Sequence, residues 1–259
     1  MFIAGLIIQH TDTPIPRIML SFFCESTAVG SLNFIGGEKG GVGKSVMSRV
    51  LAQYFIDRQM PFTGFDTDRS HQSLTRFYSD FAAPAVVDSY ESLDAIAEAF
   101  GEDARNSVLV DLAAQTYAPM ARWIQDSELF DVFGELGIRI NCWHVMDGGK
   151  DSVALLGNLL DTYGDKPRYI IVLNQGRAAD FSIFDQSAEK QRALVLGAHI
   201  ITLPKLQETA MRKIDAQNTS FWAAINHKSA EADALGLLER QRVKGWLKKA
   251  YEAIDGVGL

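Results

Sequence analysis

Short apolar runs alternate with longer amphipathic stretches along the chain from about residue 31 onward. The run at 32–35 is followed by a stretch at 45–58 whose apolar residues recur at helical spacing, which predicts a strand and then a helix. By the same reasoning, further strands are expected at 62–65, 85–88, 107–110, 138–145, 169–173 and 199–203. Further helices are expected at 71–80, 93–100, 151–163, 184–196 and 230–254.

This alternation predicts an α/β fold with three layers, in which a mostly parallel, twisted sheet is flanked by helices. Residues 1–31 carry Pro14 and Pro16 without a clear period, so we expect an N-terminal extension before one domain over 32–259. Ligands of such sheets bind beyond the carboxyl ends of the strands. The polar residues expected at those ends are Lys39 to Ser45, Asp66, Asp68, Asp111 and Asn174.

A glycine-rich run, FIGGEKGGVGKS, lies at 34–45 between the first strand and the first helix. Backbone N–H groups at a helix N-terminus bind phosphate, and glycines let the chain approach it closely. Lys44 would supply a positive charge to the β and γ phosphates, and Ser45 would ligate magnesium. The alternative is a chance glycine-rich turn, but the strand, loop, Gly-Lys-Ser and helix coincide. Because Glu38 replaces the first glycine of GxxxxGK[ST], the tight turn is expected at Gly37.

The run KGGVGKS resembles the deviant Walker A motif of the ParA/MinD family of dimeric P-loop ATPases, and the resemblance extends over 32–203. It implies a P-loop NTPase domain at 32–259, ATP and Mg²⁺ as cofactors, and an ATP-dependent homodimer. The family's signature lysine is Lys39, which would reach the partner's phosphate during catalysis. A solvated loop lysine is the alternative. The nucleotide-binding residues implied in the loop are Gly40, Gly41, Val42, Gly43, Lys44, Ser45 and Val46.

Acidic residues follow two of the predicted strands, and the resemblance gives each a role. Asp68 would orient the attacking water as a catalytic residue, while Asp66 would support the magnesium shell or the loop. Either aspartate could instead only cap a turn or helix. Asp111 ends the run VLVD, which looks like a Walker B strand, and would hold a magnesium-bound water. The family's proline is missing after it, so Gln115 is the expected γ-phosphate sensor.

Asn174 ends a later strand, where an asparagine of the family reads adenine; an amide can both accept from and donate to that base. A turn-forming asparagine is nearly as good an interpretation. The guanine-binding pattern NKxD is absent from the run NQGR at 174–177, so ATP is favoured over GTP.

Composition narrows the class of protein. A net charge of -7 argues against a protein that coats nucleic acid, and an apolar fraction of 47% suffices for a core. The two cysteines, Cys24 and Cys142, are far apart and suit reduced thiols rather than a zinc site. The histidines show no ligand spacing. No run approaches the ~20 apolar residues that span a bilayer, so a cytoplasmic location is expected.

Basic residues gather in the last predicted helix, beside an apolar stripe that contains Val243, Trp246 and Leu247. The stripe is expected to pack on the sheet with its basic residues solvated. Non-specific DNA contact and membrane contact are the alternatives, and the membrane is the least favoured. The basic residues are Arg240, Arg242, Lys244, Lys248 and Lys249.

These features predict an ATP-binding and ATP-hydrolysing dimeric switch that acts in plasmid partition, mobilisation or cargo positioning. Hydrolysis to ADP and phosphate is expected to be slow and stimulated by a protein partner. A metabolic ligase or amidotransferase of the same P-loop group is one alternative, although the chain has little spare length for a substrate domain. A nucleotide-binding regulator without hydrolysis is another.

Overall fold

The computed structural model describes residues 30–101, 106–227 and 234–259. Within them, seven strands form a single sheet in the order β3-β2-β4-β1-β5-β6-β7. Every neighbouring pair is parallel, which confirms the predicted α/β class. In chain order the strands are β1 Ser31–Gly36, β2 Phe62–Asp66, β3 Ala82–Pro84, β4 Ser107–Asp111, β5 Arg139–Met146, β6 Arg168–Asn174 and β7 His199–Leu203.

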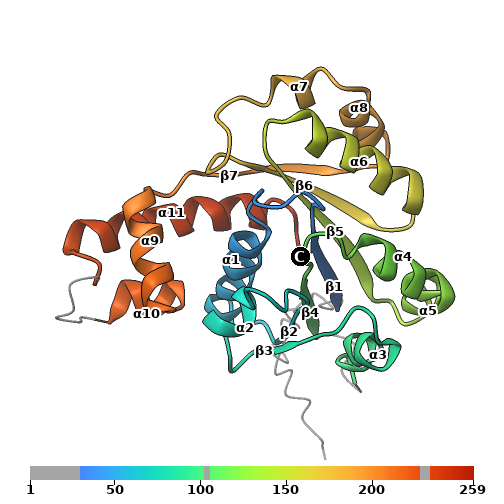
Figure 1. Ribbon diagram of the computed structural model, residues 1–259, viewed down its shortest axis with the longest axis horizontal. Helices are drawn as coiled ribbons and strands as arrows, with labels where there is room; N and C mark the ends of the chain where they lie inside the picture. Colours follow the sequence, from blue (N-terminus) through green and yellow to red (C-terminus); the bar gives the residue numbers. More distant parts are fainter. Residues whose placement is uncertain (1–29, 102–105, 228–233) are drawn as a thin grey trace, which may run out of the picture.

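Helices cover both faces of this sheet and complete the three layers (Figure 1). One face packs against α1 Lys44–Asp57, α2 Ser73–Phe77, α9 Glu208–Gln217, α10 Phe221–Asn226 and α11 Leu237–Asp255. The other face packs against α3 Tyr90–Glu98, α4 Tyr117–Asp126, α5 Leu129–Glu135, α6 Lys150–Tyr163, α7 Ser182–Asp185 and α8 Ala188–Val195. None of the helices in the described part of the chain combines the length and hydropathy that a membrane crossing requires.

The central strand β1 is fixed in register by a buried asparagine. Asn33 donates from Nδ2 to the Val108 carbonyl of β4, 3.3 Å away, and accepts on Oδ1 from Asn141 Nδ2 and Trp143 Nε1 of β5. A buried polar group is costly unless it is paired, so only the correct register satisfies these side chains. The loop that follows β1 therefore begins from a rigid position at the middle of the sheet.

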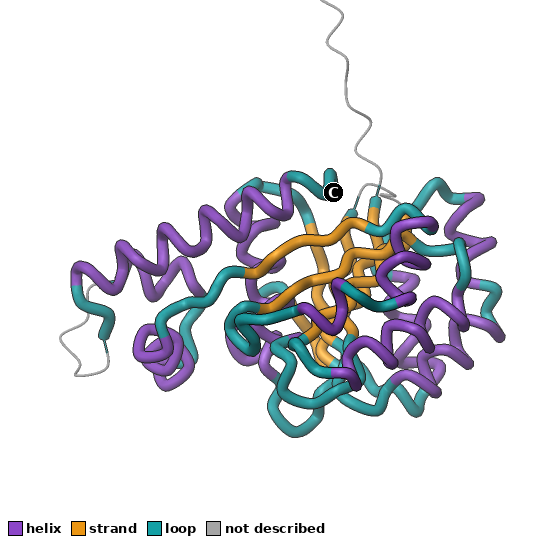
Figure 2. Tube along the Cα trace, turned by 90° about the horizontal axis from the view of Figure 1, so that it is seen from above, coloured by secondary structure: helices purple, strands orange, loops and turns teal. Residues whose placement is uncertain are grey.

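Three helices, α9, α10 and α11, form a lobe that extends beyond one edge of the sheet, as Figure 2 shows. The lobe is joined to α1 through Arg49, whose side chain is only 4% exposed. Its Nη1 lies 2.7 Å from Oδ1 of Asp215, and its guanidinium carbon lies 3.6 Å from the ring centre of Phe77. Among the described residues, nothing bonds the other two guanidinium nitrogens, Nε and Nη2.

The last helix packs as the favoured interpretation expected. The stripe Val243, Trp246, Leu247, Ala250 and Ile254 is buried in α11. Two of its basic side chains pair with neighbours, Arg242 with Gln207 and Lys248 with Glu252. Exposed basic residues remain on its surface, so contact with DNA stays a prediction.

Several predicted boundaries were wrong. The strand expected at 85–88 does not form; β3 lies just before it, at Ala82–Pro84, where an edge strand tolerates Pro84. The helix expected at 71–80 is the five-residue α2. The helix expected at 184–196 is interrupted, and Ser187 caps a separate α8 by accepting from the Lys190 N–H. Helices α4, α5, α9 and α10 were not predicted. The expected extension at 1–31 lies almost wholly outside the described residues, as does Cys24.

Candidate functional site

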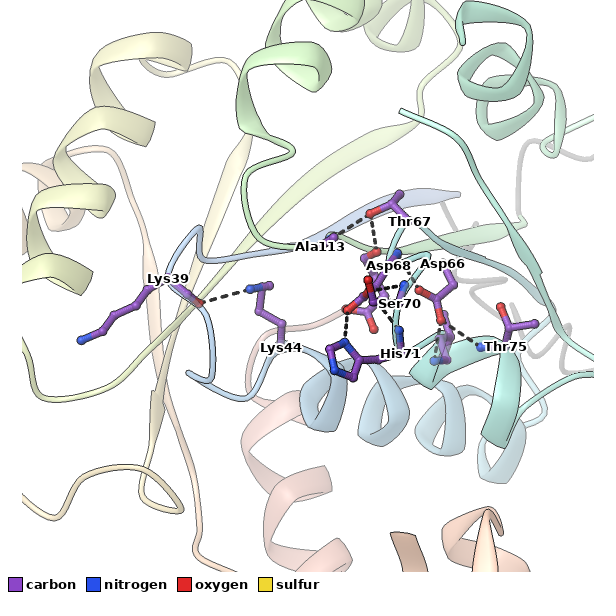
Figure 3. A network of polar contacts seen from close by, with 11 residues as sticks. Lys39, Lys44, Asp66, Thr67, Asp68, Ser70, His71, Thr75 and Ala113 are labelled. Carbon is purple, nitrogen blue, oxygen red and sulfur yellow. Dashed lines mark hydrogen bonds and ion pairs between the residues drawn. The ribbon is translucent and has the colours of Figure 1, made fainter. Parts of the chain in front are cut away.

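The residues singled out from the sequence lie at the carboxyl ends of the strands, around the N-terminus of α1, and Figure 3 shows Lys44, Asp66 and Asp68 among them. The loop after β1 leads into α1, and the adjacent strands β4 and β2 end at Asp111 and Asp66, which are register partners. Asn174 ends β6. Parallel strands bring their carboxyl ends to one edge, so the topology assembles this site from segments far apart in sequence.

The loop 37–43 has the backbone geometry that its glycines permit. Gly37, Gly41 and Gly43 have φ of 127°, 80° and 103°, so the tight turn at Gly37 is confirmed. A Cβ at Gly37 would lie 2.5 Å from the Val145 carbonyl oxygen. No described side chain caps α1, and no acidic residue lies in its first turn. The first N–H groups and the positive end of the helix dipole are therefore available to an anion.

Lys44 folds back over this loop. Its Nζ donates to the carbonyl oxygens of Gly37 and Lys39, at 2.8 and 3.2 Å, and the residue is 8% exposed. Burial lowers the pKa of Lys44 below its ordinary value, while the charges of Asp111, Asp68 and Glu38 oppose this shift. A third N–H remains for a phosphate oxygen.

Lys39 points away from Lys44 in Figure 3 and is paired within its own chain. Its Nζ lies 2.9 Å from Oδ2 of Asp147 and 3.8 Å from Oδ2 of Asp151. The Asp147 hydrogen bond raises the pKa of Lys39, opposed by partial desolvation. About a third of the Lys39 side chain is exposed, so the ammonium group is within reach of an approaching molecule.

Asp66 binds main-chain N–H groups. Its Oδ2 accepts from Leu74 and Thr75 at the start of α2, at 2.8 and 3.1 Å, and its Oδ1 accepts from Asp68. Burial raises the pKa of Asp66, and these N–H groups oppose the rise. The side chain therefore supports the loop that carries Asp68, which is one of the two roles expected for it.

Asp68 likewise forms a local turn. Its Oδ1 accepts from the N–H groups of Ser70 and His71, and its Oδ2 lies 3.1 Å from His71 Nδ1. Burial alone would raise the pKa of Asp68, but the bonds from His71 and Ser70 together lower it. A carboxylate has about four lone-pair positions, so these contacts leave room for one more donor.

The Asp111 carboxylate is buried, and neither oxygen has a hydrogen-bond partner among the described residues. Burial raises its pKa to about 7, and the charge of Asp66 adds to this rise. The hydroxyls of Ser48 and Ser45 lie near the carboxylate without a hydrogen bond of acceptable geometry to it, and together with the Lys44 ammonium they oppose the rise. A buried carboxylate without a partner is costly unless a cation or water binds it. Asp111 and Ser45 therefore fit a magnesium site.

Protein side chains alone would not complete such a site. The described residues contain no group of three or more His, Cys, Asp or Glu side chains that could hold a metal. Mg²⁺ commonly takes one or two protein ligands and fills its other positions with water and substrate phosphate oxygens. The arrangement suits a metal that arrives with a polyphosphate.

Asn174 binds the backbone of the glycine loop. It is buried, its Nδ2 donates to the Val42 carbonyl at 2.7 Å, and its Oδ1 accepts from the Gly176 N–H at 2.9 Å. A Cβ at Gly43 would lie 2.1 Å from Asn174 Nδ2, so this contact requires glycine. Sequence reasoning missed this positioning role, and adenine recognition by Asn174 stays a prediction.

Two further side chains were missed. Thr67 bonds the loop after β4, and Glu38 accepts from the Tyr117 N–H of α4 at 2.9 Å. The unusual Glu38 was visible in the sequence as a departure from the general motif. Gln115, the expected phosphate sensor, is exposed and has a positive φ of 65°.

The chain is similar to known proteins over most of its length. No family model matches the chain. It is 21% identical to TraL of Escherichia coli, over 85% of this chain and 95% of that one. It is 19% identical to MobD of Acidithiobacillus ferrooxidans, over 88% of this chain and 97% of that one. Its fold is similar to that in the MinC:MinD cell division protein complex of Aquifex aeolicus, with a TM-score of 0.50, 13% identity, and coverage of 84% and 96%.

The sheet order, the glycine loop and these similarities support the same assignment of fold. The chain has the P-loop NTPase fold of MinD and is similar in sequence, over most of its length, to TraL and MobD.

Proposed function

We propose that the protein is a dimeric switch of the ParA/MinD type that binds and hydrolyses ATP. The observation that carries this proposal is the buried Asp111 carboxylate, which has no hydrogen-bond partner in the described part of the chain and lies beside Lys44 and the N-terminus of α1, which no described side chain caps. The carboxyl ends of the strands thus present main-chain donors, an ammonium group and a carboxylate that could bind a metal ion. Polyphosphate with Mg²⁺ satisfies all three at once.

The residues of this chain bind and orient the reactants. Backbone N–H groups of Gly40 to Val46 surround the phosphates, and Lys44 binds their β and γ oxygens. Ser45 and, through a water molecule, Asp111 would hold Mg²⁺, which would supply positive charge to these oxygens. Asp68 accepts a hydrogen bond from the attacking water and keeps it in line with the phosphate.

Dimerisation completes the site through Lys39. Its ammonium group is partly exposed and held by a surface ion pair with Asp147, and such pairs are weak. In the dimer Lys39 exchanges Asp147 for the γ-phosphate in the partner, where it stabilises the charge that develops during hydrolysis. A protein partner that stabilises this arrangement accelerates turnover, and hydrolysis separates the subunits.

The cellular task that we favour is plasmid mobilisation or partition. Similarity to TraL and MobD over nearly their whole length supports this branch over cell division. Exposed basic residues of α11, such as Lys244 and Lys249, offer a surface for non-specific DNA contact in the dimer.

The test measures ATP turnover and the sedimentation of the protein with ATP, ADP or no nucleotide, with and without DNA. Lys44→Ala should abolish turnover and nucleotide-dependent dimers, whereas Asp68→Ala should retain dimers that persist in ATP. Lys166→Ala is the matched control and should behave as wild type, because Lys166 lies at the amino ends of the strands, just before β6. No affinity for adenine nucleotides with Mg²⁺ would contradict the proposal. Turnover only with a small carboxylic acid would instead favour a metabolic ligase.

A further inference from the structure

The loop between β4 and α4, residues 112–116, is held mainly by its neighbours. Its own short-range bond runs from the Thr116 hydroxyl to the Ala113 carbonyl at 2.9 Å, and Leu112 donates its N–H to the Ile35 carbonyl of β1. Gln115 takes a positive φ without being glycine, which is an uncommon and strained conformation. A loop of this kind needs outside contacts to keep one shape.

Thr67 supplies the contact at the start of the loop. Its hydroxyl donates to the Asp111 carbonyl at 3.0 Å and accepts from the Ala113 N–H at 2.8 Å, as Figure 3 shows. Its own N–H also donates to the Asp111 carbonyl, and the residue is only 5% exposed. Because Thr67 lies between Asp66 and Asp68, these bonds connect the backbone of both aspartates to the loop after Asp111.

Glu38 supplies the contact at the end of the loop. Its Oε1 accepts from the N–H of Tyr117, the first residue of α4. Thr116 precedes the helix but does not cap it, since its hydroxyl bonds Ala113 instead. A carboxylate at this position both satisfies a helix N–H and complements the helix dipole. This contact explains why a glutamate stands where other P-loops have glycine.

A cavity of about 60 Å³ lies behind the loop, between the start of the P-loop and α4. Its walls include Glu38, Leu112 and Tyr117 as well as apolar side chains from α4 and α6. Protein interiors are close-packed, so such a space next to a loop allows its side chains to move without displacing the core. Loop 112–116 therefore has tethers at both ends and room for a second position.

We propose that Thr67 and Glu38 are positioning residues that tie loop 112–116 to the nucleotide site, so that a change at the phosphates moves α4. Glu38 belongs to the phosphate-binding loop and Thr67 to the segment that carries Asp68. The two side chains thus link the phosphate-binding loop and the segment of Asp68 to the two ends of loop 112–116, Thr67 at its start and Glu38 at the first residue of α4. This inference rests on the proposed function for its nucleotide dependence, although the tethers themselves exist without nucleotide.

The experiment compares Thr67→Val, which removes the hydroxyl but keeps the shape, with Thr67→Ser, which keeps the hydroxyl. Thr75→Val is the matched control, because the buried Thr75 hydroxyl has no hydrogen-bond partner among the described residues. Glu38→Leu and Glu38→Gln form the corresponding pair at the other tether. Each full-length protein is followed by hydrogen exchange of the segment 112–117 without nucleotide, and by the kcat and KM of ATP turnover.

We expect Thr67→Val and Glu38→Leu to speed exchange in 112–117 by about tenfold, the factor that corresponds to the loss of one net hydrogen bond. Their kcat should fall by at least about fivefold while KM changes less than about twofold, because loop position rather than ATP affinity is altered. Thr67→Ser and Glu38→Gln should restore both quantities, and Thr75→Val should leave the exchange of 112–117 as in wild type.

Unchanged exchange in Thr67→Val and Glu38→Leu would overturn the tethers. Faster exchange with an unaltered kcat would overturn their coupling to the phosphates. If the wild type neither binds nor hydrolyses ATP, the proposed function fails and the nucleotide coupling fails with it. In that case the exchange measurement, made without nucleotide, still decides whether the two tethers exist.

Discussion

Lys39 and Asp147 form an ion pair across the site, with Nζ 2.9 Å from Oδ2. The other oxygen of Asp147, Oδ1, accepts from the Gly149 N–H and the Ser152 hydroxyl. Only one of the two carboxylate oxygens therefore engages the lysine. If Lys39 acts on a partner's phosphate, this pair competes with dimer formation.

Asp147→Asn should tighten the ATP-dependent dimer, because an amide keeps the Oδ1 contacts but no longer attracts the ammonium group. We expect the dimer dissociation constant to fall by about two- to fivefold, in line with a weak surface pair. Sedimentation equilibrium in ATP measures this constant. Asp151→Asn is the control, since its carboxylate is more distant at 3.8 Å and 81% exposed, and should change the constant less. Weaker dimers in Asp147→Asn would contradict a trans role for Lys39.

The raised pKa of Asp111 predicts how pH affects stability without nucleotide. The folded pKa is about 7, whereas an unfolded aspartate has a value near 3.9. Between these values the folded state binds more protons, so this group makes the protein less stable as pH rises from about 4 to 7. The full effect, present above pH 7, is on the order of 4 kcal/mol as an upper bound.

Asp111→Asn isolates this contribution. Buried His144, whose pKa is lowered to about 4, has the opposite pH dependence between its folded value and its unfolded value near 6.5, and it is common to both proteins. The variant should gain stability relative to wild type by at least about 1 kcal/mol on going from pH 5 to pH 8. Urea denaturation at several pH values tests this, and a constant difference would mean that Asp111 does not titrate in this range.

Asn174→Ala should weaken the binding of ATP and GTP about equally. Its side chain bonds the Val42 carbonyl and the Gly176 N–H, so its loss frees the loop that we propose to surround the phosphates rather than removing a base contact. We expect a loss of about five- to tenfold for each nucleotide, since one buried hydrogen bond is worth roughly 1 kcal/mol. Calorimetric titration with both nucleotides decides the matter. A loss confined to ATP would show that Asn174 reads adenine.

Arg49 and Asp215 should respond unequally to substitution. Asp215→Ala leaves the buried guanidinium without its carboxylate and should destabilise the protein by roughly 1–3 kcal/mol. Arg49→Met removes a charge whose Nε and Nη2 have no partner in the described structure, while keeping contact with Phe77. It should cost less than about 1 kcal/mol or stabilise the protein. Guanidinium denaturation measures both, and equal losses would contradict this account.

Much of the fold could be predicted because its signals are local. The apolar run that ends at Asp111 and the glycine loop before Lys44 can each be recognised from a few consecutive residues. The elements that were mispredicted or missed are stabilised by residues far away in the sequence. β3 is a strand because it pairs with β2, not because of its own residues. The short α9 and α10 are stabilised by packing against α1 and α11, which no window of sequence contains.

The site shows the same division. The residue types that we propose to bind phosphate were visible in the motif, whereas the contacts that position them were not. Nothing near Thr67 in the sequence indicates that its hydroxyl bonds Ala113, 46 residues away. Asp147, the partner of Lys39, is farther still along the chain, so the resting position of Lys39 could not be predicted. The residue types of the site can therefore be read from short segments of sequence, whereas their positions depend on how the sheet brings distant segments together.

The central place of β1 also affects how the chain is made. Its pairing partners follow late: Ser107 of β4 is 76 residues beyond Ser31, and Asn141 of β5 is 108 residues beyond Asn33. At roughly 5–20 residues per second, the ribosome needs on the order of ten seconds to supply them. Until then β1 has two open edges, which are templates for aggregation. The loop after β1 gains its rigid base only after β5 is synthesised, so the nucleotide that we propose it binds would stabilise only the later part of folding on the ribosome.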